Sequence, residues 1–413
     1  MKRPPLALVL VCALALICLL AACSKEEPEK KPEVDWLRRD FPAAVEAARE
    51  TTVRLALEDD SEAAAHWVDT WLAPELKRRH GITLERVSGG LALARTLAAE
   101  KAAGTSTGGV DLFWTGGAGF RDLKRAGALF GPFSDKLPNV QAYVNREVAA
   151  TDMGLPTEGF EVPAGWNQFV FEYDSAKVKN PPDTFAGLLD WCREHPGRFT
   201  YPAPPDPVGS AFLRQTLCAL SGGGEQYAGP FNEGLYRDRA VLLWAYLEEL
   251  RPLLWNAGKT QPKDAAALAA LLARGEVDLA VSLKPLHAQH EILAGRYKDT
   301  VRTFVPREGS VFGLSSTLIP FNAPNKPGAM VTADLILSPE AQLSKFDPRV
   351  WGDFPAVDVT LLPQETQSRI VGTKLGKATL PFGALGVSAV PDMAGEYGRA
   401  LDQDWVARFA TGN

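Results

Sequence analysis

The residues best suited to hold a ligand follow two apolar, strand-like segments. VRLAL (53–57) is followed by Glu58-Asp59-Asp60, and VDLFW (110–114) is followed by Thr115-Gly116-Gly117. Carboxylates pair with cationic groups, and glycines allow backbone N–H groups to approach a ligand closely. A dinucleotide loop is excluded, because the pattern G-x-G-x-x-G begun at Gly117 requires glycine where Asp122 stands. The candidate ligand-binding residues in these segments are Asp59, Asp60, Trp114, Thr115, Gly116 and Gly117.

The acidic segment favours a positively charged solute. Carboxylates beside the indole rings of Trp114 and Trp166 suit a cation through ion pairs and cation–π contacts, and thiamine-like or polyamine-like molecules have this chemistry. Acidic residues before a helix are also favourable for the helix dipole alone. Lys284 favours an anion or a zwitterion instead. The sequence therefore predicts a cationic or zwitterionic solute and leaves the choice between them open.

Further candidates for binding lie in the second half of the chain. Trp166 opens the extended run WNQFVFEY, and Gly209 and Ser210 start a helix. Free N–H groups at such a helix start favour an anionic or carbonyl group, although an ordinary capped helix end is the alternative. The remaining candidates are Tyr201, in the loop before that helix, and Ser282 and Lys284, after the strand-like segment VDLAV.

The sequence predicts no catalytic, metal or cofactor site. H-E-x-x-H is missing from the chain, and Gly258-Lys259-Thr260 lacks the upstream glycine of a phosphate loop. His287 and His290 share a helix face, but with Glu291 they still lack a fourth metal ligand. A hydrolase that uses the acidic segment as one member of a carboxylate pair is left open.

The N-terminus predicts export and attachment to a lipid. Met1-Lys2-Arg3 precedes the uncharged run PLALVLVCALALICLL, which is short for a membrane-spanning helix. Leu20-Ala21-Ala22-Cys23 resembles a bacterial lipobox, which implies cleavage before Cys23 and acylation of that residue. Acyl chains would hold the protein to a membrane surface. A plain signal peptide or an uncleaved anchor is the alternative.

Composition is that of an ordinary globular protein. The chain has 413 residues, of which 46% are hydrophobic and 23% charged. A net charge of −6 with scattered basic residues argues against a nucleic-acid partner. Of the five cysteines, only Cys192 and Cys218 lie beyond the lipobox, and they either form a disulfide or remain buried thiols.

Strand-like and helical patterns alternate between residues 50 and 127. This alternation predicts an α/β fold with a parallel sheet and right-handed crossovers. Ligands bind beyond the carboxyl ends of such strands, where the acidic and glycine-rich segments both lie. Two extended runs, at 166–173 and 311–321, flank a middle block of helices. They predict two lobes joined by a two-stranded hinge, with the ligand in the cleft between the lobes.

The predicted organisation has four parts. Residues 1–22 are a lipoprotein signal peptide, and residues 23–34 are a charged, proline-containing tether. The first lobe is discontinuous and comprises residues 35–165 and 316–413. The second lobe comprises residues 166–315 and includes the hinge crossings.

An ordered set of segments resembles one protein family. The segments are LAAEKAAG, GGVDLFWTGGAGF, LFGPFSDKLPN, FEYDSAKV, PGRFTYPAPPDPVGSAFLRQ and ADLILSPEAQ. Together they resemble the type II solute-binding proteins of bacterial ABC importers, most of all the YnjB-type family. The resemblance implies a bilobal fold, capture of a small solute outside the cytoplasmic membrane, and delivery to permease and ATPase subunits. A monomer without cofactors, in the periplasm of a Gram-negative host, is expected.

Two points limit what this resemblance implies. Relatives more often carry tryptophan and glycines where this chain has Glu58-Asp59-Asp60, so their ligand does not transfer directly. A lipoprotein that senses its solute without passing it to a permease is an alternative function.

Overall fold

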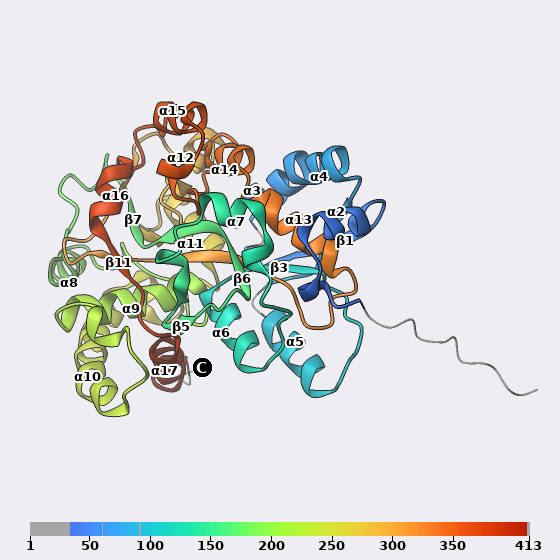
Figure 1. The fold of residues 1–413 in the computed structure, drawn as a ribbon. Helices are drawn as coiled ribbons and strands as arrows, with labels where there is room; N and C mark the ends of the chain where they lie inside the picture. Colours follow the sequence, from blue (N-terminus) through green and yellow to red (C-terminus); the bar gives the residue numbers. More distant parts are fainter. Residues whose placement is uncertain (1–33, 60, 91, 411–413) are drawn as a thin grey trace, which may run out of the picture. The chain divides into compact units, whose positions relative to one another are not determined.

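The computed structural model describes residues 34–59, 61–90 and 92–410. The predicted signal peptide, Cys23 and Asp60 lie outside these residues, so their roles stay predictions. Residues 39–413 form a compact unit, and the elements below belong to it (Figure 1). Among the helices that the structure describes, none is both long enough and apolar enough to cross a membrane.

The first lobe is built on a six-stranded sheet. Its strands are β1 (Thr52–Leu57), β2 (Thr83–Val87), β3 (Leu112–Gly116), β6 (Glu161–Gln168), β10 (Ser310–Leu318) and β11 (Ala389–Pro391). The order is β11-β10-β3-β1-β2, and β6 also pairs with β10. β1 is parallel to β2 and β3, as the alternating pattern predicts, and Leu57 lies opposite Trp114. β10 is antiparallel to β3 and β6.

Helices cover both faces of this sheet. They are α2 (Phe41–Ala48), α3 (Glu62–Trp67), the π-helical η2 (Val68–Leu72), α4 (Ala73–His80), α5 (Leu93–Ala102), α6 (Gly117–Arg125), α7 (Pro138–Tyr143), α13 (Lys326–Ile336) and α14 (Pro339–Phe346). α5 and α6 share a buried apolar cluster with Phe113 of β3. On the opposite face, Gly328 of α13 approaches Val53 of β1, and α2 packs on α13.

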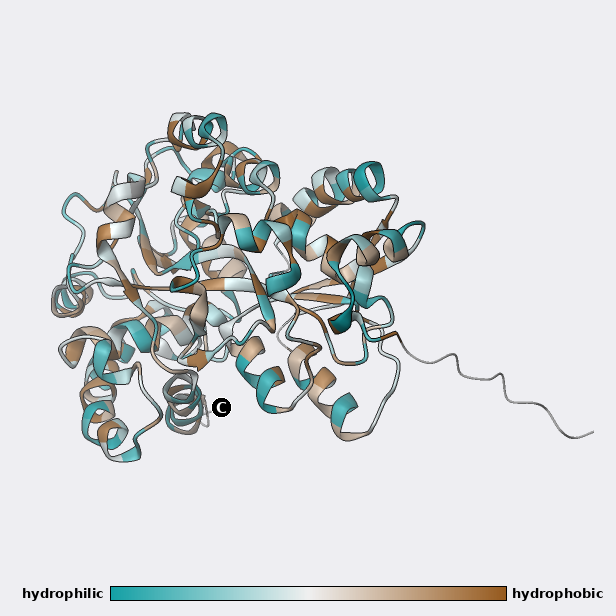
Figure 2. Cartoon of the chain, viewed as in Figure 1, coloured by the Kyte–Doolittle hydropathy of each residue, from teal (hydrophilic) through white to brown (hydrophobic). Residues whose placement is uncertain are grey.

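Local signals set the ends of the first helices. The Ser61 side chain accepts a hydrogen bond from the Ala64 N–H, so the predicted N-cap of α3 is confirmed. Gly81 has φ 70° directly after α4, the left-handed conformation predicted for that position. The outer surface of α4, the sequence APELKRRH, is largely hydrophilic in Figure 2.

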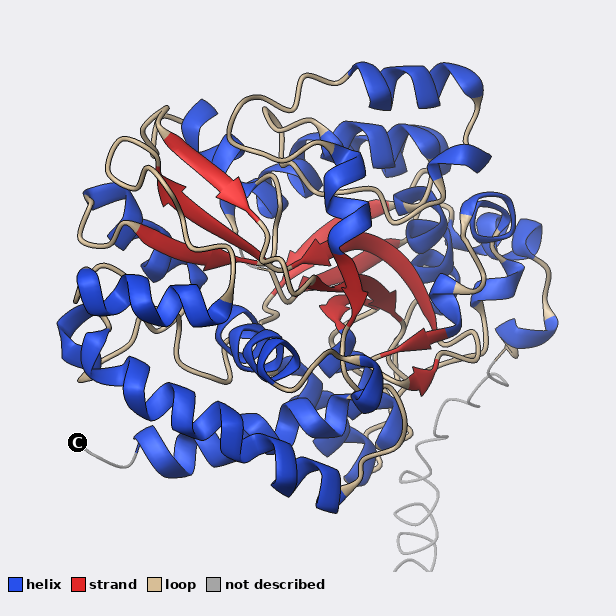
Figure 3. Ribbon diagram, turned by 90° about the vertical axis from the view of Figure 1, so that its left-hand side faces the viewer, coloured by secondary structure: helices blue, strands red, loops and turns tan. Residues whose placement is uncertain are grey.

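The second lobe is built on a three-stranded sheet. β7 (Val170–Asp174) lies between β8 (Leu279–Ser282) and β9 (Val301–Phe304) and is antiparallel to both. The surrounding helices are α8 (Phe185–Glu194), α9 (Pro207–Leu220), α10 (Glu233–Leu250), α11 (Ala265–Arg274), α12 (His287–Leu293) and α17 (Gly395–Trp405). Figure 3 shows the strands of both sheets with helices packed around them.

Three crossings of the described chain connect the lobes. The first runs from β6 directly into β7, where the Phe169 N–H donates to the Val311 carbonyl, and the second runs from β9 into β10. These are the two extended crossings that the sequence predicts. The third runs from α14 through α15 (Gln364–Gly372) and α16 (Phe382–Ser388) to β11 and α17. Two short strands, β4 (Thr151–Asp152) and β5 (Leu155–Pro156), form a separate hairpin.

Helix α17 packs against the second lobe, which differs from the predicted division of the lobes at residue 316. α17 packs against α9, and Tyr397, Leu401 and Trp405 belong to the same buried cluster as Phe169 and Phe171. The apolar face of α17 is therefore covered by the second lobe, although the sequence analysis assigns residues 316–413 to the first.

The two cysteines of the second lobe are separate. Cys192 and Cys218 are free and buried, and burial raises the pKa of each thiol to about 12. Of the two alternatives, the structure has buried thiols.

Candidate functional site

A buried charged cluster lies where the two lobes meet. It consists of Asp353, in the loop after α14, Lys345 of α14, and Lys284, in the loop after β8. The Asp353 carboxylate accepts from the Lys284 ammonium at 2.6 Å and from the Lys345 ammonium at 2.8 Å. Lys345 also donates to the Phe354 carbonyl at 2.9 Å. The cluster thus ties a loop of the second lobe to a helix of the first.

Electrostatics in this cluster follow from burial and pairing. Burial by itself raises the pKa of the Asp353 carboxyl, but the two ammonium groups outweigh it and hold the pKa below its ordinary value. Burial lowers the pKa of Lys345. Burial also disfavours the charged form of Lys284, yet Asp353 and Asp59 raise its pKa. Asp59 and Lys284, both predicted to bind the solute, therefore act on one another.

Gly165 of β6 makes room for this cluster. A Cβ added there would overlap the Asp353 carboxylate and approach the Ser315 hydroxyl to 2.8 Å. A strand residue with any side chain would displace the buried ion pairs, so glycine is required by the close approach.

Four tryptophans form a continuous cluster beside the charged residues; it consists of Trp67, Trp71, Trp114 and Trp351. The Trp67 ring stacks on Trp71 at 5.3 Å and meets Trp114 at 6.1 Å and Trp351 at 5.7 Å. Trp114 and Trp351 lie 5.5 Å apart. The Lys284 ammonium is 5.6 Å from the Trp351 ring centroid, a cation–π distance. Trp114, which the sequence predicts to contact the solute, thus belongs to a cluster of four tryptophans, and within this cluster Trp351 lies beside Lys284.

The glycine-rich segment is already bonded to a carboxylate of the protein. The Gly116 N–H donates to Glu58 Oε2 at 2.7 Å, and the Thr115 hydroxyl donates to the same oxygen. Thr115 is buried. The Gly116 N–H, which was predicted to donate to the solute, therefore already donates to Glu58. An anionic solute would have to displace that carboxylate.

Glu58 was not among the binding residues predicted from the sequence, although it bonds to the glycine-rich segment. Leu57 lies opposite Trp114 in the parallel pair of β1 and β3, so the next residue of each strand also adjoins the other. This strand register therefore places Glu58 beside Thr115. Asp59 is half-buried, and its carboxylate accepts from the Ser61 N–H at 3.0 Å.

Packing explains the other glycines of this segment. An added Cβ on Gly117 would overlap the Asp152 carboxylate and lie 2.7 Å from Met153 Cγ. A Cβ on Gly119 would overlap the Thr115 hydroxyl. A Cβ on Gly116 would meet its nearest neighbour, Glu58, at 3.9 Å, which is ordinary contact. Two of the three glycines are thus needed for the start of α6 to pack.

Three predicted residues of the second lobe lie in its core. The Tyr201 ring stacks on Phe212 at 4.3 Å, and its hydroxyl accepts from Trp405 Nε1 at 3.0 Å. Gly209 and Ser210 are buried in the first turn of α9. This differs from the expected position in the cleft, because α17 covers this side of the lobe.

The start of α9 is capped from within the chain. The Asp206 carboxylate accepts from the Val208 N–H at 2.9 Å and from the Gly209 N–H at 3.2 Å. Burial raises the pKa of Asp206, although these N–H groups oppose the shift. The N–H groups expected to receive a solute anion thus have a protein acceptor, as in the N-cap alternative.

The remaining predicted residues support the cluster. The Ser282 hydroxyl accepts from the Lys284 N–H at 3.1 Å, which fixes the loop that carries this lysine. Trp166 is half-buried and stacks on Phe312 at 4.5 Å with ring planes 7° apart. Its backbone N–H donates to the Phe354 carbonyl at 3.2 Å, beside Asp353. Trp166 therefore lies at the hinge crossing, next to the charged cluster.

His287 and His290 bind oxygens of the protein. His287 Nδ1 lies 2.8 Å from a carboxylate oxygen of Glu172 in β7, and Tyr297 donates to the other oxygen at 3.1 Å. His290 Nδ1 is 3.0 Å from the Pro348 carbonyl. This geometry gives His287 a role in neutralising a buried carboxylate.

Comparison with known proteins gives consistent matches. A family model described as bacterial extracellular solute-binding protein matches residues 71–370. Protein YnjB of Escherichia coli (strain K12) is 35% identical over 345 residues, which are 83% of this chain and 87% of that protein.

Solved structures share the fold at low sequence identity. The spermidine/putrescine ABC transporter substrate-binding protein PotD from Streptococcus pneumoniae is 16% identical, with a TM-score of 0.59 over 87% of this chain and 98% of that chain. The periplasmic binding protein AfuA from Actinobacillus pleuropneumoniae, with fructose-6-phosphate bound, is 15% identical, with a TM-score of 0.62 over 88% and 99%. The predicted two-lobed periplasmic-binding fold is confirmed.

Proposed function

Because the chain belongs to the bacterial extracellular solute-binding protein family, we propose that it captures one small solute between its lobes for an ABC importer. The lobes close around the solute because the bound solute contacts both of them, and its differential affinity shifts the population toward the closed form. The closed, loaded protein is then recognised by a permease that works with an ATPase subunit. The protein acts as a monomer and performs no chemistry on the solute.

The observation that carries this proposal is the contact between the lobes at Lys284. This residue follows β8 of the second lobe, whereas Asp353 and Asp59 belong to the first. Trp114 and Trp351 supply apolar faces next to these charges. A solute between the lobes can bind to charged groups of both lobes at this place.

The solute is cationic or zwitterionic in this proposal. Glu58 occupies the Gly116 N–H, which disfavours an anion at the start of α6, and Asp59 presents a further carboxylate. Lys284, which shares the Asp353 carboxylate with Lys345, provides for a solute carboxylate. The relatives differ here, since PotD is described with spermidine/putrescine and AfuA with fructose-6-phosphate. The assignment therefore rests on the residues of this chain.

A solute screen tests this proposal. Amino acids, polyamines, thiamine-like compounds, sugars and oxyanions are compared by thermal shift, and the hit is measured by calorimetry. Asp59→Asn should weaken binding of a cationic or zwitterionic hit about tenfold or more, because it removes one ion pair, about 1.4 kcal/mol. Asp60→Asn is expected to act in the same direction.

Asp135→Asn serves as the matched control. Its carboxylate lies on the same lobe and is 77% exposed. A tight anionic or sugar ligand that binds Asp59→Asn as well as the unmodified protein would contradict the proposed charge of the solute.

We also propose that Cys23 anchors the protein outside the cytoplasmic membrane. Cys23→Ala should abolish labelling by a fatty-acid probe and partitioning into detergent, since the acceptor thiol of the lipobox is gone. The melting temperature should stay unchanged, because residues 39–413 form their own compact unit. Persistent labelling of the variant would show that the lipid is attached elsewhere or that the lipobox reading is wrong.

A further inference from the structure

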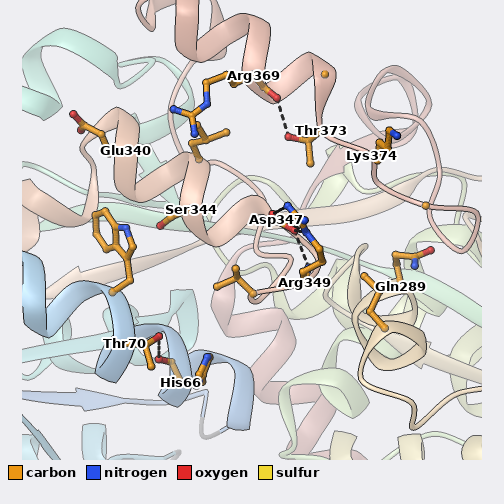
Figure 4. A pocket seen from close by; sticks show the side chains of 16 residues that line it. His66, Thr70, Gln289, Glu340, Ser344, Asp347, Arg349, Arg369, Thr373 and Lys374 are labelled. Carbon is orange, nitrogen blue, oxygen red and sulfur yellow. Dashed lines mark hydrogen bonds and ion pairs between the residues drawn. The ribbon is translucent and has the colours of Figure 1, made fainter.

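A large pocket lies beside the tryptophan cluster, on the side away from Lys284. Its volume is about 1120 Å³, which is ample for a drug-sized organic molecule. The first lobe contributes α3, η2, α14 and the loop after it, and the second lobe contributes α12. The end of α15 and the loop that follows it line the remaining side. Figure 4 shows polar side chains from these segments around the pocket.

The pocket has an apolar wall. Trp71, Leu343 and Val350 line it and are half-buried, and Leu293 lines it with 51% of its surface exposed. Trp71 is held in place by its stacking on the fully buried Trp67. Apolar side chains left at solvent inside a concave surface are typical of a site for a ligand with an apolar or aromatic body.

The charges of the pocket are not balanced. Arg349 binds Asp347 through its Nε at 3.0 Å and its Nη2 at 2.5 Å, and this pairing lowers the pKa of the Asp347 carboxyl. Glu340 lies 3.8 Å from Arg79, outside the pocket. These carboxylates therefore already have cationic partners.

Two further cations line the pocket without such partners. Within the described residues, the side chains of Arg369 and Lys374 make no hydrogen bond or ion pair, and both are exposed. Figure 4 shows Arg369 on α15 and Lys374 on the loop beyond it. Two unpaired cations next to an apolar wall favour an anionic group on the ligand.

This pocket is separate from the charged cluster. Trp67, which is buried, contacts Trp71 on one side and Trp351 on the other, and Trp351 in turn contacts Lys284. The tryptophans thus stand between the pocket and the Lys284–Asp353 pair. A molecule in the pocket can occupy it while a solute is held at Lys284.

We propose that this pocket is a second binding site, for an organic anion with an aromatic or other apolar body. The body lies against Trp71 and Leu293, and the phosphate, sulfonate or carboxylate group is held by Arg369 and Lys374. Because Trp71 of η2 and Leu293 of α12 belong to different lobes, the ligand contacts both lobes and favours their closed arrangement.

The test uses 1-naphthyl phosphate as the probe and the purified full chain. Calorimetry should show saturable binding that weakens as salt is added. The double variant Arg369→Gln/Lys374→Gln should weaken binding at least tenfold, and Trp71→Ala should weaken it as well. All three positions are at least partly exposed, so the variants are expected to fold.

Lys377→Gln is the matched control, because Lys377 is exposed on the same loop but does not line the pocket. It should leave the affinity for the probe unchanged. Absence of saturable binding, an unaffected double variant, or an equal loss in Lys377→Gln would each overturn the proposal. The readout needs no knowledge of the solute at Lys284, so failure of the solute screen and failure of this site are distinguishable.

Discussion

Glu172 is a buried carboxylate whose charge is met by one histidine. Burial by itself lowers the pKa of His287, but Glu172 at 2.8 Å and Glu291 at 3.9 Å outweigh it and raise the pKa to about 9. Arg296 acts in the opposite direction, and Tyr297 donates to Glu172 without adding charge. The folded protein therefore binds the His287 proton more tightly than the unfolded chain does.

This difference predicts how stability depends on pH. Because the folded pKa is raised above the ordinary value of 6.5, the contribution is fully present below pH 6.5 and is lost as the pH rises through about 9. Its size is roughly 3 kcal/mol, since each pKa unit corresponds to about 1.4 kcal/mol. Urea unfolding at pH 6, 7.5 and 9.5 should show this loss in the unmodified protein. In His287→Gln the loss should be absent, whereas the exposed-site control His195→Gln should retain it.

The two histidine variants make the result decisive. The free energy of unfolding is plotted against pH for His287→Gln and for the unmodified protein. Parallel curves would mean that the Glu172–His287 pair does not contribute this pH-dependent stability.

At the scale of elements, the glycines at the start of α6 differ in how much space surrounds them. A Cβ on Gly119 would overlap the Thr115 hydroxyl, whereas a Cβ on Gly116 has space of 3.9 Å. Gly119→Ala should therefore lower the free energy of unfolding by about 1–3 kcal/mol. Gly116→Ala should change it by less than about 0.5 kcal/mol. Urea unfolding measures both, and equal effects would refute the role assigned to Gly119.

Short-range patterns carried much of the fold. The strand at 53–57, the Ser61 N-cap and Gly81 all follow from a few neighbouring residues, because periodicity and capping are local. Trp114, near the end of a strand, and Lys284, just after one, were predicted to bind the solute because ligands collect at that edge of a sheet. The structure places them in the tryptophan cluster and the charged cluster, and their role in binding stays a prediction.

Long-range contacts decided the rest. Nothing near Tyr201 or Ser210 in the sequence indicates that α17 will cover them, since the Trp405 side chain that reaches Tyr201 is 204 residues away. Lys345, Trp351 and Asp353 lie in a helix end and an irregular loop without periodic pattern, so their meeting with Lys284 depends on tertiary packing alone. Glu58 was within reach of prediction, because the parallel register of β1 and β3 sets it beside Thr115.

At the scale of the whole molecule, the proposed closure of the lobes around a solute predicts a change in both stability and size. A cognate solute at about 100 times its dissociation constant should stabilise the fold by roughly 2.7 kcal/mol. The melting temperature should rise by several degrees. Small-angle scattering should give a smaller radius of gyration with solute than without it. A compound of the same charge that fails to bind is the control, and an unchanged radius at saturation would eliminate closure as the mechanism.

The position of α17 has a consequence for how the protein is made. Synthesis delivers the chain from its N-terminus, and Trp405 is made 204 residues after Tyr201. Until it emerges, Tyr201 and the neighbouring aromatic core of the second lobe lack their final cover. A chain interrupted late in translation thus exposes a large apolar surface and becomes a target for chaperones and proteases. Folding of the second lobe therefore depends on α17, a segment that is synthesised long after the aromatic residues that it covers.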